Sequence, residues 1–290
     1  EGAIITAKQF QMQTGIHQVV FKGTAEVANH AFQKCTSIRN LMIPEGVSIG
    51  DGAFYGCTGI TQLTIAKGVS IGSAAFRSCR GIIDLTIGED VSMGDSAFGE
   101  CTGIRALNIL EGVVINDRGF WHCTAIKELS LPEGINIGKQ VFEDCVGITK
   151  LIIPEGAIIN ERAFDGCTGI TDLTLSTKVF IGEAAFQGCT GITKLISPKE
   201  VNISDLAFAG CSAIKQLTIS EGITIGKWAF MGCSGINTVY ANPLFDLNQL
   251  RVAMPELSPQ VIRDQLYFSV ERSPISNKGA MQRAFAKLLL

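Results

Sequence analysis

The sequence has few of the side chains on which catalytic and metal sites are usually built. Only three histidines occur among its 290 residues, and no two cysteines form a Cys-x-x-Cys pair. A zinc site made from paired Cys and His ligands is therefore not predicted, and no cofactor is implied. No run reaches the roughly 18 apolar residues that a membrane-spanning helix needs, so no transmembrane segment is predicted.

Excess positive charge is also missing. Lys and Arg number 24 against 27 for Asp and Glu, which gives a formal net charge of -3 at pH 7 and a pI near 5.7. Tyr and Trp are scarce, with three and two residues. A nucleic-acid partner would require a basic stripe to neutralise its phosphates. No such stripe recurs along this chain, so nucleic acid is not an expected partner.

The cysteines, in contrast, are numerous and evenly spaced. There are ten, and each lies 22 residues after the previous one. Each follows a Phe by three residues and precedes an Ile by three, as Phe32 and Ile38 flank Cys35. A fixed period in this range is typical of a solenoid, in which each unit contacts mainly its neighbours. The cysteines are Cys35, Cys57, Cys79, Cys101, Cys123, Cys145, Cys167, Cys189, Cys211 and Cys233.

The apolar spacing inside one unit predicts its local structure. Leu63 and Ile65 alternate as in a half-buried strand, and Val69 and Ile71 repeat this pattern after a turn. The Ala-Phe-x-x-Cys segment has the spacing of one helical turn facing inward. We therefore expect an α/β repeat with two short parallel β-ladders and a row of short helical turns. It covers residues 1–241 in about eleven turns, because the register extends back past the first Cys.

The repeat reads I-G-x-x-A-F-x-G-C-x-G-I-x-x-L-x-I-P-E-G-V-x, and this unit resembles the BspA-like leucine-rich repeats. The resemblance holds over ten tandem copies within residues 1–241. It implies a leucine-rich-repeat solenoid. It also implies a role in adhesion or recognition, as in bacterial surface proteins and their protist relatives. A location at the cell surface or after secretion follows from the resemblance, whereas free thiols are equally compatible with the cytoplasm.

Three interpretations of the cysteines compete: disulfides, metal ligands and packing. Because the ten side chains occupy equivalent positions, they point the same way, which suits stacking better than crossed disulfides. We therefore interpret them as small buried apolar residues. His122 beside Cys123 is the one local candidate for a nucleophile with a base, but adjacent residues in a coil project in different directions. The chain is not predicted to be an enzyme.

Two sets of outward positions are candidates for partner binding. The residues that flank the inward Leu of the first strand alternate in charge and include exposed isoleucines. The outward position of the second strand carries apolar residues near the middle of the chain, with Val114 among them. Exposed apolar clusters often mark contacts. The predicted partner-binding residues are Glu128, Lys150, Ile152, Asp172, Lys194 and Ile196 on the first strand, and Ile158 and Phe180 on the second.

Residues 242–290 depart from the repeat and contain no Cys. Helix-breaking Pro and helix-capping Ser residues predict three helices, near 244–254, 258–269 and 276–290. We expect these helices to form an α-helical cap on the last coil. The third would place Met281, Phe285 and Leu288 on one side, where they could dock a partner or touch an anionic membrane. At the other end Glu1 begins in the middle of a repeat, which indicates removed sequence or a fragment.

Taken together, these features predict a non-enzymatic module that recognises a macromolecule through its strand face, in adhesion or host interaction. The expected partner is a protein such as a host or surface receptor, with a glycan as the other option. The alternative is an intracellular scaffold or secreted effector whose helical tail engages a partner.

Overall fold

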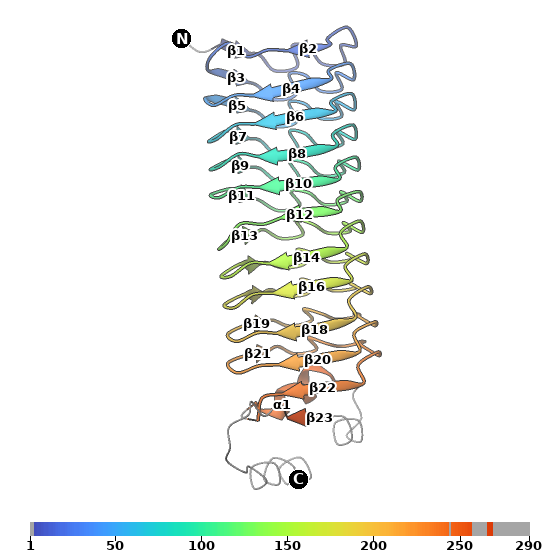
Figure 1. Ribbon diagram of the computed structural model, residues 1–290. Coiled ribbons are helices and arrows are strands. Elements are labelled where there is room, and N and C mark those ends of the chain that lie inside the picture. The colour runs from blue at the N-terminus through green and yellow to red at the C-terminus, as the bar shows by residue number, and fades with distance from the viewer. Residues whose placement is uncertain (1–2, 244, 257–265, 269–290) are drawn as a thin grey trace.

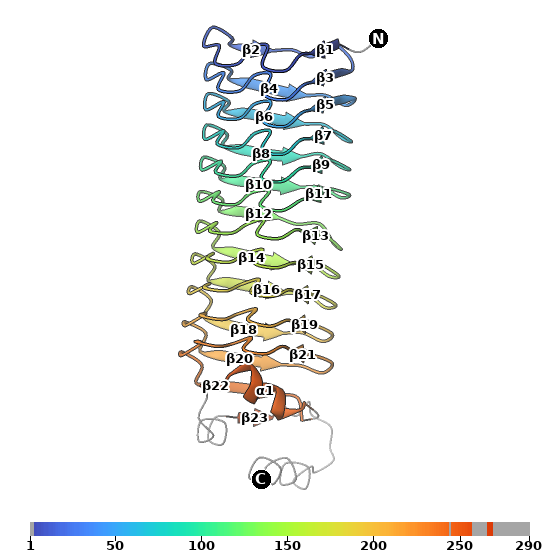
Figure 2. The same ribbon diagram turned by 180° about the vertical axis from the view of Figure 1, so that it is seen from behind.

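The computed structural model describes residues 3–243, 245–256 and 266–268. Coils of 22 residues stack into a nearly straight rod, with one strand of each coil above its equivalent in the next (Figures 1 and 2). Each coil contributes two strands, and equivalent strands pair in parallel, as Leu63 does with Leu85. The predicted solenoid with two parallel β-ladders is therefore confirmed.

The strand that precedes the Pro-Glu-Gly turn forms what we call the first ladder. Its inward residues are buried and its outward residues exposed, as in β6 (Gln62–Ile65). The other members are β2 (Gln18–Val19), β4 (Asn40–Ile43), β8 (Asp84–Ile87), β10 (Ala106–Ile109), β12 (Glu128–Ser130), β14 (Lys150–Ile153), β16 (Asp172–Leu175), β18 (Lys194–Ser197), β20 (Gln216–Ile219) and β22 (Thr238–Ala241).

The strand that follows the turn forms the second ladder, one continuous sheet of 11 strands. Its members are β1 (Ala3–Ile5), β3 (Ala25–Val27), β5 (Val47–Ile49), β7 (Ser70–Ile71), β9 (Ser92–Met93), β11 (Val114–Ile115), β13 (Asn136–Ile137), β15 (Ile158–Ile159), β17 (Phe180–Ile181), β19 (Asn202–Ile203) and β21 (Thr224–Ile225).

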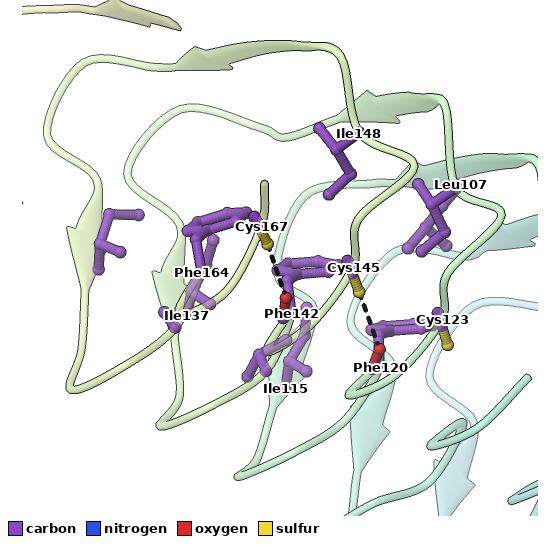
Figure 3. Close-up of a cluster of buried hydrophobic side chains, with 14 of the residues drawn as sticks. Leu107, Ile115, Phe120, Cys123, Ile137, Phe142, Cys145, Ile148, Phe164 and Cys167 are labelled. Carbon is purple, nitrogen blue, oxygen red and sulfur yellow. Dashed lines mark hydrogen bonds between the residues drawn. The ribbon is translucent and has the colours of Figure 1, made fainter. Parts of the chain in front are cut away.

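The core is a column of phenylalanine rings along the rod. Successive rings from Phe10 to Phe230 stack with centroids 5.1 to 5.6 Å apart and nearly parallel planes. Figure 3 shows three of them, Phe120, Phe142 and Phe164. Offset stacks of this kind add to the burial of large apolar area. Since no single coil can bury such a ring on both faces, stability comes from the contacts between coils.

All ten cysteines are free and buried, as the packing interpretation predicted. Their thiols also make a hydrogen bond that the sequence did not indicate. The Cys145 Sγ donates to the Phe120 carbonyl oxygen of the previous coil at 3.2 Å, and Cys167 donates to that of Phe142 at 3.0 Å (Figure 3). The Phe120 carbonyl also accepts the backbone N–H of Cys123 at 3.2 Å. The Cys thiol thus supplies a second donor to a carbonyl that lies inside the rod, which a purely apolar side chain could not do.

The expected helical turns before each Cys are not helices, so that prediction was wrong. Backbone φ is positive at the residues five and one before Cys, such as His30 (58°) and Lys34 (59°). These residues interrupt right-handed helical geometry. Alternate amides therefore point along the rod, and the Phe32 N–H donates to the Ala53 carbonyl of the next coil at 2.7 Å. In a helix this amide would bond within its own coil.

The α-helical cap is also corrected. One helix, α1 (Leu247–Ala253), lies within the first predicted range, and the Asp246 side chain caps its N-terminus. The Ala253 carbonyl accepts the Phe230 N–H at 3.0 Å and so replaces the missing next coil. The second predicted helix is wrong at residues 266–268, where β23 (Leu266–Phe268) pairs in parallel with β22. A strand can satisfy the backbone of that edge, and a helix cannot. The range 276–290 lies outside the described residues.

One inward position of the first ladder is exceptional. Ser197 is 1 % exposed, and its hydroxyl has no hydrogen-bond partner among the described residues. Equivalent positions carry Ile153 and Ile219, both buried. An unsatisfied buried hydroxyl costs about 1–3 kcal/mol. Ser197 is therefore a weak point of the core.

Substitution of Ser197 by Ile should stabilise the protein by about 2 kcal/mol, because it removes the unsatisfied hydroxyl and restores apolar packing. Urea denaturation followed by circular dichroism measures the change. Ser176→Ile, at a half-buried position outside the core, is the matched control and should change stability by less than about 0.5 kcal/mol. An unchanged or lower stability of Ser197→Ile would show that the site has no room for the larger side chain.

The buried thiols predict a loss of stability at alkaline pH. Burial raises the pKa of Cys57 and Cys101 to about 12, and it also raises that of Cys79. Unfolded thiols ionise near pH 8.5. Stability is therefore fully present below about pH 8.5 and is lost as pH rises toward 12, by about 1.4 kcal/mol per pH unit for each such thiol. Urea denaturation between pH 7 and 11 measures this slope.

A serine variant provides the control for this slope. Cys101→Ser keeps a donor for the Phe76 carbonyl, which Cys101 Sγ contacts at 3.1 Å, but its hydroxyl does not titrate in this range. The variant should lower the slope by about 1.4 kcal/mol per pH unit. A slope identical to that of the unmodified chain would contradict the assignment.

Candidate functional site

The first ladder, unlike the second, is interrupted. No ladder pairing joins β12 to β14 or β16 to β18 in the part of the chain that the structure describes, so the ladder forms separate sheets. Both interruptions precede a coil whose first strand is followed directly by a proline, Pro154 after β14 and Pro198 after β18. In coils without this Pro, the same position donates a backbone bond, as from Ser176 to the Ile153 carbonyl at 3.0 Å. Proline has no N–H to donate.

The other prolines at this position shorten the pairing between neighbouring strands of the first ladder without removing it. The pairing of β2 with β4, which precedes Pro44, involves two residues of each strand. The pairing of β10 with β12, which precedes Pro132, involves three. Pairings into coils without Pro involve four, as between β14 and β16. Pro at the end of the strand therefore explains where the first ladder shortens or opens.

A shallow groove of about 410 Å³ lies on the outer face of the first ladder, over β8, β10, β12 and β14. It spans the interruption between β12 and β14. Ala106 is short where the neighbouring outward positions carry Asp84 and Glu128, and this difference hollows the face. The inward Leu129 of β12 is only partly buried. The groove therefore combines polar walls with accessible apolar surface.

The structure places the predicted partner-binding residues on two surfaces. Glu128, Lys150 and Ile152 line the groove. Asp172, Lys194 and Ile196 are exposed farther along the same face. Ile158 and Phe180 lie on the second ladder, where they are in register and each 40 % exposed. Val114 is separated from Ile158 by Asn136.

The charges of the first-ladder face differ from those elsewhere on the rod. Ion pairs bridge neighbouring coils at the turns, as between Lys139 and Glu161 at 2.9 Å and between Lys178 and Glu155 at 2.8 Å. None of the ion pairs between described residues includes the predicted binding charges of the first ladder, although these occupy consecutive coils. These charges are Glu128, Lys150, Asp172 and Lys194.

The His122–Cys123 candidate does not form a nucleophile with its base. The His122 ring faces Asp144, with Nε2 and Oδ2 2.8 Å apart, on the exposed turn side. Cys123 is buried, and its Sγ donates to the Phe98 carbonyl at 3.2 Å. Burial raises the pKa of the Cys123 thiol well above its usual range, which disfavours the reactive thiolate.

The described residues contain neither a metal-binding cluster nor a membrane-spanning helix. His, Cys, Asp and Glu side chains form no group of three or more there that could hold a metal ion. No helix in that part of the chain is long and apolar enough to cross a membrane.

The repeat region matches the family model described as BspA type leucine rich repeat region (6 copies), over residues 3–127 and 113–237. The chain therefore belongs to this family of leucine-rich-repeat proteins. Such repeat proteins generally act as interaction modules that present extended binding surfaces. No curated protein matches the chain.

Several solved leucine-rich-repeat structures resemble the chain. One from Bacteroides ovatus is 22% identical, with 84% of this chain and 87% of that chain covered and a TM-score of 0.40. A leucine rich repeat protein of T. pallidum is also 22% identical, with 61% and 78% covered and a TM-score of 0.40. The pneumococcal vaccine antigen PcpA is 14% identical, with 93% and 85% covered and a TM-score of 0.41. At these values the likenesses add nothing to the fold assignment, which rests on the coils themselves.

Part of this site was visible in the sequence. The alternating charges and exposed isoleucines were found because outward positions can be counted from the repeat. Asp84, Ala106 and Asn108, which also line the groove, were not predicted. The signals that could have found them are the short Ala106 in a row of longer side chains and Pro154, which follows β14 directly.

Replacement of Pro154 by Ala should extend the ladder across the β12–β14 interruption, because position 154 would gain an N–H that can donate to the Leu131 carbonyl. We expect the amides of Lys150–Ile153 to exchange more slowly, by about 1 kcal/mol of opening free energy. Hydrogen–deuterium exchange with mass spectrometry measures this. Ala66→Pro is the reciprocal variant and should speed exchange in Gln62–Ile65, which now pairs over four residues. Unchanged exchange in both variants would contradict the role of proline.

Proposed function

We propose that the protein is a non-enzymatic recognition module that binds a macromolecular partner through the outer face of the first ladder. The observation that carries this proposal is the groove over β8–β14 together with charges that have no ion-pair partner within the described residues. A protein is the preferred partner, because the face offers apolar, hydrogen-bonding and charged groups together, as protein interfaces do. A glycan is the other option.

The exposed apolar side chains support this use of the face. Ile152 and Ile196 are 51 % and 49 % exposed, although equivalent positions in neighbouring coils carry Thr174 and Thr218. Burying an exposed Ile on binding contributes about 1.5–3 kcal/mol of hydrophobic free energy before the costs of association. Ile158 and Phe180 on the second ladder form a separate, smaller surface in this proposal.

Adhesion or host interaction at a cell surface, or after secretion, is the biological setting that we propose from the family resemblance. The alternative, a scaffold or effector that uses a helical tail, concerns residues 276–290, which lie outside the described part of the chain. It stays a prediction.

Affinity capture from host-cell lysate and from membrane or matrix fractions tests the proposed function. A bait with Lys150, Ile152, Lys194 and Ile196 replaced by Ala should retain at least about tenfold less partner than the unmodified bait, because binding energy concentrates in a few central residues. Quantitative mass spectrometry of the retained proteins and glycans gives the readout.

The control bait carries four matched Ala substitutions away from this face. They replace Lys139 and Lys178 at the turns, Val114 on the second ladder and Val146 after Cys145, all of which are exposed. This control should retain the partner. Equal retention by all three baits, or no partner on any of them, would contradict binding through the first ladder.

A further inference from the structure

Four consecutive outward charges in the middle of the first ladder read the same after reversal and inversion of sign. In chain order they are Glu128 on β12, Lys150 on β14, Asp172 on β16 and Lys194 on β18. Asp84 on β8 is a further exposed charge of this face, and it stands outside the series. Read backwards, this series of negative, positive, negative and positive becomes positive, negative, positive and negative. A surface with this property is complementary to itself under a two-fold rotation, which is the symmetry of an isologous dimer.

The two-fold axis lies between β14 and β16 and runs parallel to the strands. It places two first-ladder faces against each other with the rods antiparallel. Lys150 then faces Asp172 of the second copy, and Glu128 faces Lys194 of the second copy, so the interface contains each pair twice. Because both copies share the same spacing of about 4.8 Å between coils, the pairs stay in register. The second ladder maintains this spacing across the interruptions, since β13–β19 pair continuously.

The shapes of the two halves of the face also complement each other. On the β8–β12 side the outward residues are short at Ala106 and Ser130, and this is where the groove lies. On the β18–β20 side the corresponding residues are longer, at Ile196 and Gln216. The same rotation brings Gln216 of the second copy over Ala106 and brings Ile196 of the second copy over Ser130. Each groove therefore receives the longer side chains of the other copy.

The two interruptions of the first ladder are placed symmetrically about the proposed two-fold axis. The gap between β12 and β14 and the gap between β16 and β18 lie on either side of the two-stranded sheet β14–β16. Rotation about the axis exchanges them. The centre of the proposed interface is thus a short, separate sheet that carries Lys150 and Asp172 directly opposite each other across one ladder step.

We propose that a second copy of this chain binds to the first-ladder face, and that the two copies form an antiparallel, two-fold symmetric dimer. This inference rests on the proposed function insofar as it uses the same face, and it names the partner. The strands from β8 to β22 span about 34 Å along the rod and about 13 Å across, which corresponds to about 900 Å² buried in total. This area lies below the roughly 1,000 Å² in total that a stable specific interface needs and in the range of weak, transient ones. The dimer is therefore reversible, with a dissociation constant in the micromolar range or weaker.

Paired charge reversals test the proposal with one prediction that other interfaces do not share. The variant Lys150→Glu with Lys194→Glu makes all four charges negative, and Glu128→Lys with Asp172→Lys makes all four positive. Each variant should dimerise on the order of a hundredfold more weakly than the unmodified chain, because four opposite-charge contacts become like-charge contacts. An equimolar mixture of the two should form heterodimers.

Sedimentation velocity over a concentration series measures dimerisation, and native mass spectrometry distinguishes heterodimers by mass. Higher salt should weaken the unmodified dimer because the paired charges are screened. Glu111→Lys with Glu133→Lys is the matched control, since it reverses two exposed turn carboxylates away from this face. The control should dimerise like the unmodified chain. Circular dichroism confirms that each variant is folded.

A monomeric unmodified chain at about 1 mM, where even a millimolar dissociation constant populates the dimer, would overturn the proposal. So would undiminished dimerisation of the two single-sign variants, or a mixture that forms no heterodimer. The proposed function is separable from these results. A monomeric chain that still loses its captured partner on substitution of Lys150, Ile152, Lys194 and Ile196 would retain the recognition face and exclude the second copy as its occupant.

Discussion

The structure depends on the strict repetition of one hydrogen-bonded step between coils. Within each coil the Phe carbonyl accepts the N–H of the Cys three residues later, and the thiol of the next coil's Cys donates to the same oxygen, as at Phe120. The phenylalanine rings stack directly beside these bonds. An extra residue in any coil would displace ring and thiol together and remove one of the two donors to a carbonyl inside the rod. This constraint explains why the interval between cysteines is 22 residues throughout.

The two ladders contribute differently to the structure: the second fixes the spacing between coils, and the first carries the groove. The second ladder is one sheet of 11 strands and keeps the coil spacing. The first ladder tolerates Pro154, Pro198 and the buried Ser197, because the spacing does not depend on it alone. Its backbone can therefore open, and the groove spans one of the two openings, between β12 and β14. A repeat protein can vary one face in this way while its neighbouring sheet preserves the stack.

The charged side chains also fall into two groups, those at the turns and those on the first-ladder face. At the turns, Lys139, Lys178 and their partners form ion pairs that join adjacent coils, and such exposed pairs contribute at most about 1 kcal/mol each. Glu128, Lys150, Asp172 and Lys194 on the first-ladder face have no such partners among the described residues, and they alternate in sign along the rod. Electrostatic complementarity of this kind favours specificity and orientation of a partner more than affinity. Adhesion or recognition, as proposed for this face, needs both.

The sequence by itself determined the coil length, the inward residues and the outward charges, because a period of 22 residues assigns every position to one side of the solenoid. It misassigned the segment before Cys as a helical turn, since the positive φ at His30 and its equivalents arises only when alternate amides bond to the next coil. The thiol bond, β23 and the groove were likewise decided by tertiary structure. Each depends on groups from two coils, or from a coil and the chain after it. The thiol bond and β23 leave no local sequence pattern, whereas the groove leaves only the short Ala106 and the proline after β14 as signals.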